Sequence, residues 1–376
     1  MTRWSLDDVA RMRLLSQRLV SLEAAGAAGS GQADAGARPV DVVRHLTCTQ
    51  GQDWPGSTTS VALRTSRRSL AEVHAAYDAG EIVRSWPMRG TLFVVAAEDL
   101  GWMLDLMGAA TQQATARRRA ELGLTDEHLG RAEALAGATI PAEGLTRAGL
   151  LAVWEEAELP VDSGRGYHLI FHLALSQILC LGPTWVTEGG SVEQRFVLSE
   201  RWLPPQTPLA REEAVARWCA RYLRSHGPVT DKEFLWWSKL LRRDIAPVLE
   251  TATAELTSIK VGGARHWVDP LVLEAYGSRK RATSAPLLLP GFDEIVLGYG
   301  DRSAVMTDAQ EREHVVPGKN GVFRPTVIRA GRALGTWQRA KGKRAASDPV
   351  VVTPFGGVLP GPVEKALPRL TAGLPR

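Results

Sequence analysis

The sequence predicts an α+β fold in which three groups of helices, each followed by a β-hairpin, precede a small β-rich unit. Apolar residues recur at helical spacing through most of the first 285 residues. Pairs of short β-type runs interrupt this pattern at three places, and from about Pro286 the chain changes to short apolar runs broken by Gly and Pro. Helices followed by a hairpin form the winged-helix arrangement, so we expect three such motifs in tandem.

The first predicted unit covers residues 1–110. Ser5 and Asp8 match a capping box, and Pro39 suits the first turn of a second helix that runs out near Thr49. The Gly/Ala-rich stretch 24–38 between these helices predicts a flexible loop. Two further helices and two strands are expected over residues 57–64, 69–79, 82–86 and 91–96.

The remaining units are predicted at residues 111–205, 206–285 and 286–376. In the second unit, helices and then strands are expected over residues 125–136, 146–157, 167–179, 183–186 and 194–198. In the third unit, they are expected over residues 211–225, 231–240, 243–256, 258–261 and 266–268. In the C-terminal unit, strands are expected over residues 287–289, 294–297, 326–328, 333–339 and 349–352, before a short helix over 363–370.

Composition excludes several classes of protein. The 376 residues are 44% hydrophobic and 23% charged, which is ordinary for a globular chain with a sizeable core. No apolar run approaches the length of a membrane span, and the N-terminus lacks an apolar signal core, so we expect a cytoplasmic protein. Cys48, Cys180 and Cys219 lie far apart, which fits a reducing compartment and argues against structural zinc. A pI of about 9.1 permits a polyanionic partner.

Common catalytic motifs are absent. The chain has no Walker loop and no G-x-S-x-G elbow. His168 and His172 are four residues apart on a predicted helix, but Leu169 stands where a zinc protease would have Glu. Ordinary packed or half-exposed histidines are the simpler interpretation. We therefore expect neither a metal nor a cofactor.

The polar triplet Gln50-Gly51-Gln52 is the leading candidate for chemistry. Two carboxamides one residue apart carry no charge and cannot act as a general base. They can hold a water molecule and a developing positive charge in a fixed arrangement. The alternative is a polar helix end that serves as a cap or a solvated loop. Asp53 adjoins the pair and ranks second as a group that acts on water.

Basic and aromatic residues near the triplet are candidates for nucleic-acid contacts. Arg64, Arg67 and Arg68 precede a capped helix, and Arg89 lies between two predicted strands, where the wing of a winged helix would be. Phosphate contact is the functional interpretation, and a solvated surface is the alternative. Trp54 follows the glutamines in a Pro-Gly turn, where its ring would stack on a base or fill a groove.

Three segments together resemble a known family: the triplet 50–52, Arg-Gly-Thr-Leu-Phe at 89–93, and Phe-Asp-Glu-Ile-Val-Leu-Gly-Tyr-x-Asp-Arg-Ser at 292–303. With them, essentially the whole chain resembles the winged-helix alkylpurine DNA glycosylases AlkZ and YcaQ. The resemblance implies three tandem winged helices and a β-barrel-like C-terminal part, cupped around DNA. It implies that Gln50 and Gln52 are catalytic. We also count Arg302, in the last segment, among the expected DNA contacts.

The implied function is monofunctional excision of N7- or N3-alkylated purines from double-stranded DNA by a monomer. The QxQ form resembles the subgroup tied to self-resistance against DNA-alkylating natural products, so bulky adducts and crosslinks are expected substrates. Two departures stand out: Phe93 replaces a histidine that often follows the RGT residues, and the Gly/Ala loop is longer than expected. Two alternatives remain, a non-catalytic winged-helix regulator and a resistance protein that sequesters a toxin or its adduct.

Overall fold

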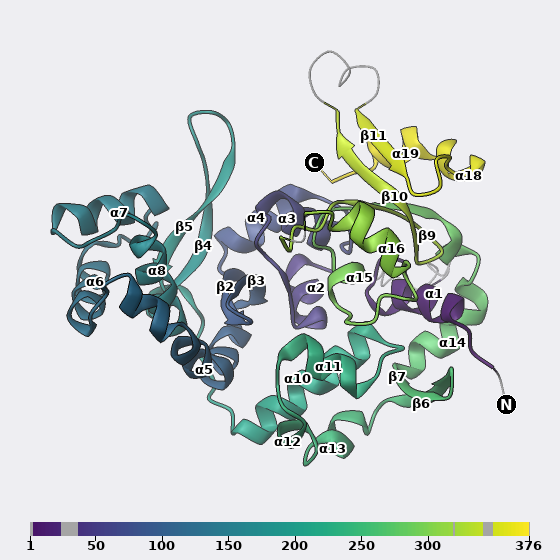
Figure 1. Cartoon of the computed structure of the whole chain (residues 1–376), viewed down its shortest axis with the longest axis horizontal. Helices are drawn as coiled ribbons and strands as arrows, with labels where there is room; N and C mark the ends of the chain where they lie inside the picture. Colours follow the sequence, from purple (N-terminus) through teal and green to yellow (C-terminus); the bar gives the residue numbers. More distant parts are fainter. Residues whose placement is uncertain (1–2, 24–36, 319, 341–348, 376) are drawn as a thin grey trace, which may run out of the picture. The chain divides into compact units, whose positions relative to one another are not determined.

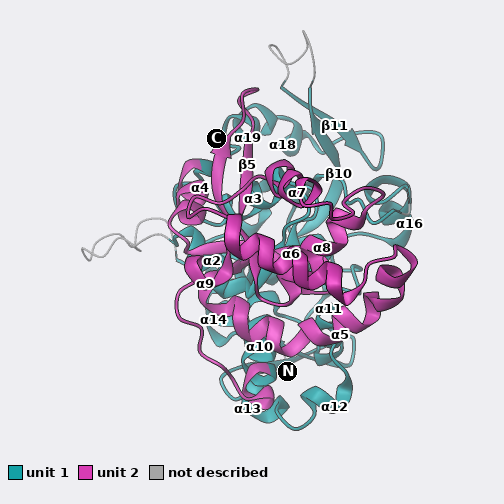
Figure 2. Ribbon diagram, turned by 90° about the vertical axis from the view of Figure 1, so that its left-hand side faces the viewer, with its two compact units in different colours: residues 1–70, 215–376 teal, residues 71–214 magenta. Residues whose placement is uncertain are grey.

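The structure, a computed structural model, describes residues 3–23, 37–318, 320–340 and 349–375. The chain divides into two compact units, which Figure 2 colours separately: unit 1, residues 1–70 and 215–376, and unit 2, residues 71–214. The predicted division into four units stays a prediction. The predicted mixture of helices with antiparallel strands is confirmed (Figure 1). Most of the loop predicted over 24–38 lies outside the described residues.

The N-terminal part of unit 1 carries the triplet. Its elements are α1 (Leu6–Ser16), α2 (Pro39–Leu46), β1 (Cys48–Gln50) and α3 (Trp54–Ala62). The capping box at the start of α1 is confirmed, because Ser5 accepts from the Asp8 N–H and Asp8 accepts from the Ser5 N–H. Pro39 occupies the first turn of α2, as expected from its missing N–H donor.

Unit 2 consists of a twisted antiparallel sheet and helices. Its elements are α4 (Leu70–Asp78, which begins at the boundary), β2 (Ile82–Met88), β3 (Thr91–Ala96), η1 (Ala97–Asp99), α5 (Leu100–Glu121), α6 (Asp126–Thr139), α7 (Arg147–Glu156), α8 (Arg165–Leu175), β4 (Leu179–Val186), β5 (Val192–Leu198) and α9 (Ser199–Trp202). The strands run in the order β3-β2-β4-β5. The long helix α5 was not predicted, because its second half, 109–121, is polar and largely exposed and shows no apolar period.

The second part of unit 1 begins with helices and a hairpin. These are α10 (Arg211–His226, which begins at the boundary), α11 (Asp231–Ser238), α12 (Arg242–Ile245), α13 (Leu249–Thr253), β6 (Thr257–Val261), β7 (Ala264–Val268), α14 (Pro270–Arg279) and η2 (Ala282–Ser284). The single helix predicted over 243–256 is therefore two short helices. A third hairpin does follow a group of helices, although the tandem winged-helix organisation itself stays a prediction.

The C-terminal part of unit 1 is an open antiparallel sheet in the order β11-β10-β9-β8, so the expected barrel-like form is wrong. Its elements are β8 (Pro286–Leu289), α15 (Glu294–Leu297), α16 (Asp308–Gln310), η3 (Glu311–Val315), β9 (Thr326–Arg329), β10 (Arg332–Arg339), β11 (Val350–Pro354), α18 (Gly361–Glu364) and α19 (Leu367–Ala372). The strand predicted over 294–297 is helix α15, because the Asp293 side chain caps the Ile295 N–H and starts a helical turn.

Within the described residues, no helix is both long and apolar enough to cross a bilayer.

Candidate active site

The two glutamines of the triplet lie at a strand end and in a turn. Helix α2 ends at Leu46, and Thr47 has a φ of 69°, which a right-handed helix cannot continue. Gln50 is therefore the last residue of the short strand β1, and Gln52 lies in the turn before α3. The expectation that they end a helix is wrong. Gln50 is half-buried and Gln52 is exposed.

The carboxamide of Gln50 folds back on its own backbone. Its Oε1 accepts from the N–H of Gly51 at 2.8 Å and from the N–H of Gln52 at 3.2 Å. Because both partners can only donate, the oxygen faces them and the NH₂ group faces the opposite way. The oxygen of Gln50 is thus engaged in holding the turn, whereas the Gln52 side chain extends from that turn into solvent.

Asp53, the second-ranked candidate, precedes α3 without making a side-chain capping bond. Its carboxylate lies against Gly56 in the first turn of α3, where a Cβ on that residue would collide with it. The absence of a Cβ at Gly56 thus leaves the space that the Asp53 carboxylate occupies. The carboxylate lies over the helix, which supports ranking Asp53 below the glutamines.

A buried polar layer lies behind β1, and the 292–303 segment supplies much of it. The Glu294 carboxylate is 1% exposed, and its Oε1 accepts from the Gln50 N–H at 3.2 Å. Its other oxygen lies 3.5 Å from Nε2 of the buried His226. Gln17 of the turn after α1 donates to the Glu294 carbonyl and to the Tyr299 hydroxyl. The triplet and the 292–303 segment, which are far apart in sequence, are therefore in contact in the fold.

Arg64 belongs to this buried layer, so its prediction as a DNA contact is wrong. Its guanidinium forms a bidentate ion pair with Asp293, at 2.8 and 2.9 Å, in which both side chains are fully buried. The remaining donors go to Gln17 and Ser60. Burial alone would raise the pKa of Asp293, but the ion pair and hydrogen bonds hold that pKa below its ordinary value. A phosphate has no access to this guanidinium.

The guanidinium of Arg302 also has several partners within the protein. Its side chain is 12% exposed and pairs with Glu311 at 2.9 Å. It donates to the Val296 carbonyl, and its guanidinium lies over the rings of Trp236 and Phe323. These contacts give Arg302 a packing role, and a phosphate would have to displace Glu311 to reach it. Its assignment as a DNA contact stays a prediction that these contacts do not favour.

The other predicted contact residues are accessible. Arg67 and Arg68 are exposed just after α3, and Trp54, the first residue of α3, is half-buried. Arg89 in unit 2 is exposed at the tip of the β2–β3 hairpin. Both Arg89 and Gly90 have positive φ, at 58° and 67°, which is the geometry of a two-residue hairpin turn. Their roles as DNA contacts stay predictions.

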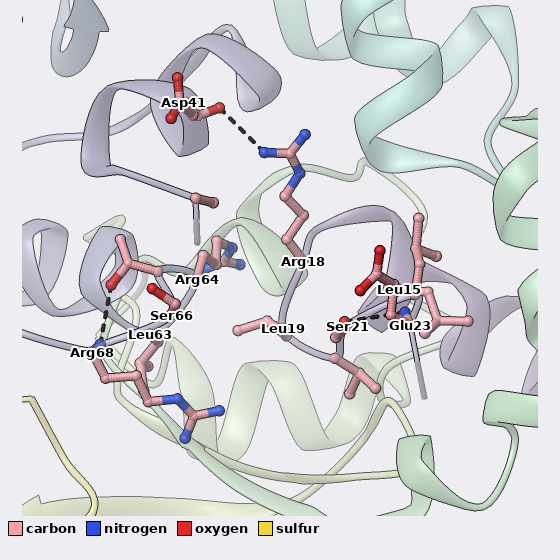
Figure 3. A pocket seen from close by; sticks show the side chains of 14 residues that line it. Leu15, Arg18, Leu19, Ser21, Glu23, Asp41, Leu63, Arg64, Ser66 and Arg68 are labelled. Atoms are coloured by element: carbon pink, nitrogen blue, oxygen red, sulfur yellow. Dashed lines mark hydrogen bonds between the residues drawn. The ribbon is translucent and has the colours of Figure 1, made fainter. Parts of the chain in front are cut away.

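Unit 1 also contains a cavity of about 640 Å³ between α1, α2 and the end of α3. Figure 3 shows Arg18 reaching toward Asp41 on one side of it and Arg68 on the other. Neither Gln50 nor Gln52 is among its 14 lining residues. The triplet therefore does not line this cavity.

Two positions in unit 2 bear on the sequence predictions. Phe93, where a histidine was expected, is 2% exposed in the core, so its ring cannot take over the role of a polar group at a surface. Burial, with help from Arg118 and Arg119, lowers the pKa of His168, and burial also lowers that of His172. Among the described residues, no group of three His, Cys, Asp or Glu side chains is placed to hold a metal.

Sequence reasoning missed the residues that support the triplet. Glu294, Asp293, His226 and Gln17 lie between 33 residues before and 244 residues after Gln50 in the sequence, and no local pattern connects them. One signal was available, because Asp293 and Glu294 are adjacent acids within an otherwise apolar run. Charged residues are rarely buried unless they are paired, so two acids in an apolar run indicate buried partners elsewhere in the fold.

The comparisons with known proteins agree with one another. The family described as "DNA glycosylase AlkZ-like" matches residues 43–372. The chain is similar to a protein of Streptomyces sahachiroi named "Interstrand DNA cross-link repair glycosylase", at 26% identity over 331 residues and 84% of each chain. The solved structure "Streptomyces sahachiroi DNA glycosylase AlkZ" is similar in fold, with a TM-score of 0.73 and 23% identity, over 100% of this chain and 98% of that one.

Proposed function

Because the chain belongs to the AlkZ-like DNA glycosylase family, we propose that it is a monofunctional enzyme that removes N7- or N3-alkylated purines from double-stranded DNA. Family membership makes the protein an enzyme that hydrolyses N-glycosyl bonds. The name of its Streptomyces relative, an interstrand cross-link repair glycosylase, supports extending the substrates to bulky adducts and crosslinks. The exposed position of Gln52 also suits large lesions.

Alkylation prepares the bond for cleavage. An N7- or N3-alkylated purine is cationic, so the C1′–N bond breaks with its electron pair moving onto the base, which leaves neutral. No general acid is needed. The deoxyribose passes through a state with oxocarbenium character, and water adds to C1′ and loses its proton to solvent. The protein has only to steady the positive sugar and hold the water.

The glutamine geometry suggests different roles for the two carboxamides. The Gln52 oxygen is accessible and is assigned to the sugar cation and the attacking water. The Gln50 oxygen already accepts from two backbone N–H groups, so Gln50 shapes the turn that carries Gln52 and offers its NH₂ group outward. A neutral amide is a weaker electrostatic partner than a carboxylate. This weakness suits a bond that alkylation has already activated and spares undamaged DNA.

DNA binding is assigned to accessible residues that follow the triplet in the sequence and to the tip of the β2–β3 hairpin. We assign phosphate contacts to Arg67, Arg68 and Arg89, and base stacking or groove filling to Trp54. We further interpret the three helix groups with their hairpins as tandem winged helices, in which Arg89 lies at the tip of the first wing. Arg64 and Arg302 have no part in this assignment.

The observation that supports the proposal most is the turn at Gln50–Gln52, which the Gln50 carboxamide holds and which exposes Gln52. It occurs in a chain of the AlkZ-like DNA glycosylase family. The test measures release of N7-methylguanine from methylated duplex DNA under single-turnover conditions. Loss of one positioned polar group typically costs about 100- to 1000-fold in rate, and we expect at least that from Gln50→Ala/Gln52→Ala. Gln338→Ala, which removes an exposed glutamine of β10, is the matched control.

Equal base release by the wild type and the double variant would contradict the proposal. Tight binding of lesion-containing DNA without any abasic product would instead favour a protein that sequesters adducts. Binding without preference for damaged DNA would favour a regulator.

A further inference from the structure

A buried carboxylate binds the backbone at the end of β1. The Gln50 N–H donates to Oε1 of Glu294 at 3.2 Å, and Glu294 is 1% exposed. On the other side of the same residue, the Gln50 carboxamide holds the N–H groups of Gly51 and Gln52. Gln50 therefore holds the turn with its side chain and is itself held, at its N–H, by the carboxylate of Glu294 from another element.

Glu294 is itself fixed on several sides. It is the first residue of α15, directly after Asp293, which is tied to Arg64 by the buried ion pair. Its Oε2 lies 3.5 Å from Nε2 of His226, and its carbonyl accepts from Gln17. A carboxylate so constrained has little freedom to move when DNA binds.

The His226 ring completes the support. Its Nδ1 lies 2.9 Å from the Ser225 hydroxyl, and the ring stacks on Tyr222 with centroids 4.3 Å apart. Because the Glu294 carboxylate can only accept, its contact places a proton on Nε2 of His226. Burial lowers the pKa of His226, so the ring is neutral at neutral pH and acts as a hydrogen-bond donor without a charge.

The position of this contact gives it a consequence for catalysis. Gln52 follows Gln50 by two residues, so a rotation of the Gln50 peptide displaces the side chain that we assign to the sugar cation. Displacement of a reacting group by about 1 Å can cost about 100-fold in rate. Removal of the Glu294 oxygen frees the Gln50 peptide to rotate toward another acceptor.

We propose that Glu294, supported by His226, is a positioning residue for base excision, which sets the orientation of Gln52 through the N–H of Gln50. The inference rests on the proposed function of the triplet. Glu294 does not touch the substrate and is not a catalytic residue. What it contributes is the acceptor oxygen, so a side chain of the same length that keeps this oxygen should preserve most of the activity.

The test compares Glu294→Ala, Glu294→Asp and Glu294→Gln in the full-length protein with N7-methylguanine duplex DNA. Alanine removes the acceptor, and aspartate keeps the charge but withdraws the oxygen by one methylene. Glutamine keeps the oxygen without the charge and turns its NH₂ group toward His226, whose neutral ring can then accept at Nε2 and donate from Nδ1 to Ser225. We expect about 10- to 100-fold slower single-turnover excision for alanine and aspartate, with unchanged affinity for lesion DNA, and near wild-type rates for glutamine. Partial unfolding would lower the amplitude of release and leave the rate constant of the folded fraction unchanged.

The matched control is Glu233→Ala. Glu233 also accepts two backbone N–H groups, those of Gly300 and Asp301, at 2.6 and 3.1 Å, but it does not contact β1. It should retain the wild-type rate. If Glu294→Ala does not fold, Glu294→Asp decides.

Wild-type rates for Glu294→Ala or Glu294→Asp, equal losses in the glutamine variant, or an equal loss in Glu233→Ala would overturn the inference. Failure of the proposed function looks different, because then the wild type releases no base or Gln52→Ala releases it at the wild-type rate.

Discussion

Arg64 and Arg68 belong to one basic run in the sequence, yet they lie in two regions of opposite character. Arg64 is buried in the polar layer behind β1, where Asp293, Gln17 and Ser60 take its donors. Arg68 is exposed beyond the end of α3. The same residue type therefore stabilises the interior at one position and is accessible to phosphate at the other. The partners that each arginine finds in the fold, more than residue type or spacing, decide which of these two roles it has.

The two arginines lie on either side of a change in chain direction after α3. Arg64 lies in the turn directly after the helix, and the Ser60 hydroxyl at the inward face of α3 donates to the same Asp293 carboxylate. Farther along, Arg68 has a φ of 51°. This change of direction carries Arg67 and Arg68 out of the buried layer.

The largest expected effect comes from breaking the buried ion pair. Arg64→Met leaves the Asp293 carboxylate buried without its partner, and removal of one member of such a pair typically costs about 3–5 kcal/mol of stability. Urea denaturation measures the free energy of unfolding. Arg64→Met/Asp293→Leu should lose less, because no charge then stays unpaired.

The matched control is Arg38→Ala, which breaks the exposed pair of Arg38 with Asp41. Exposed pairs typically contribute about 0–1 kcal/mol. A loss in Arg64→Met no larger than in Arg38→Ala would remove the contrast between buried and exposed arginines.

Arg302→Ala should give an intermediate effect. This arginine pairs with Glu311 and covers two aromatic rings, so we expect about 1–2 kcal/mol of destabilisation from lost packing and pairing. The same variant should leave the salt dependence of DNA binding unchanged. A drop of about one in the slope of log K against log salt would show that Arg302 does contact phosphate.

Arg68→Ala should change binding more than stability. Loss of one phosphate contact weakens binding to damaged and undamaged DNA alike and lowers the salt slope by about one. The free energy of unfolding should stay within about 0.5 kcal/mol of the wild type, because the side chain is exposed. Arg369→Ala, an exposed arginine of α19, is the control. Equal salt slopes in the wild type and Arg68→Ala would contradict this assignment.

The smallest expected effect is a pH dependence from the buried layer. Burial lowers the pKa of His226 from 6.5, although Glu294 raises it in part, and Arg13 and Arg64 lower it further. As the pH falls below 6.5, the unfolded chain takes up a proton that the folded chain does not, so stability falls down to the lower folded pKa. Thermal unfolding from about pH 7.5 to about 5.5 measures this slope.

His226→Gln isolates that contribution, because the other histidines with lowered pKa values are present in both proteins. We expect a shallower dependence of the melting temperature on pH in the variant. Identical dependences would mean that His226 does not contribute.

Patterns local in the chain predicted most elements correctly. The Ser5 cap, the Pro39 helix start and the hairpin around Arg89 depend on neighbours within a few residues, and the structure has all three. Predictions were wrong where tertiary contacts favour a different structure from the one that the local sequence pattern indicates. Residues 294–297 have the composition of a strand but form a helix, because Asp293 caps the first turn. The helix places the Glu294 carboxylate in the buried layer, where it accepts from the Gln50 N–H.

The order of residues by itself determined the alternation of helices and hairpins, the placing of Gln50 and Gln52 one residue apart, and the three segments that resemble a known family. Only the tertiary structure decided which arginine is buried, which glutamine oxygen is occupied, and that Glu294 holds the Gln50 peptide across 244 residues. The physical reason is that caps and turns are satisfied within a few residues, whereas a buried charge or peptide N–H needs a partner that folding alone can bring to it.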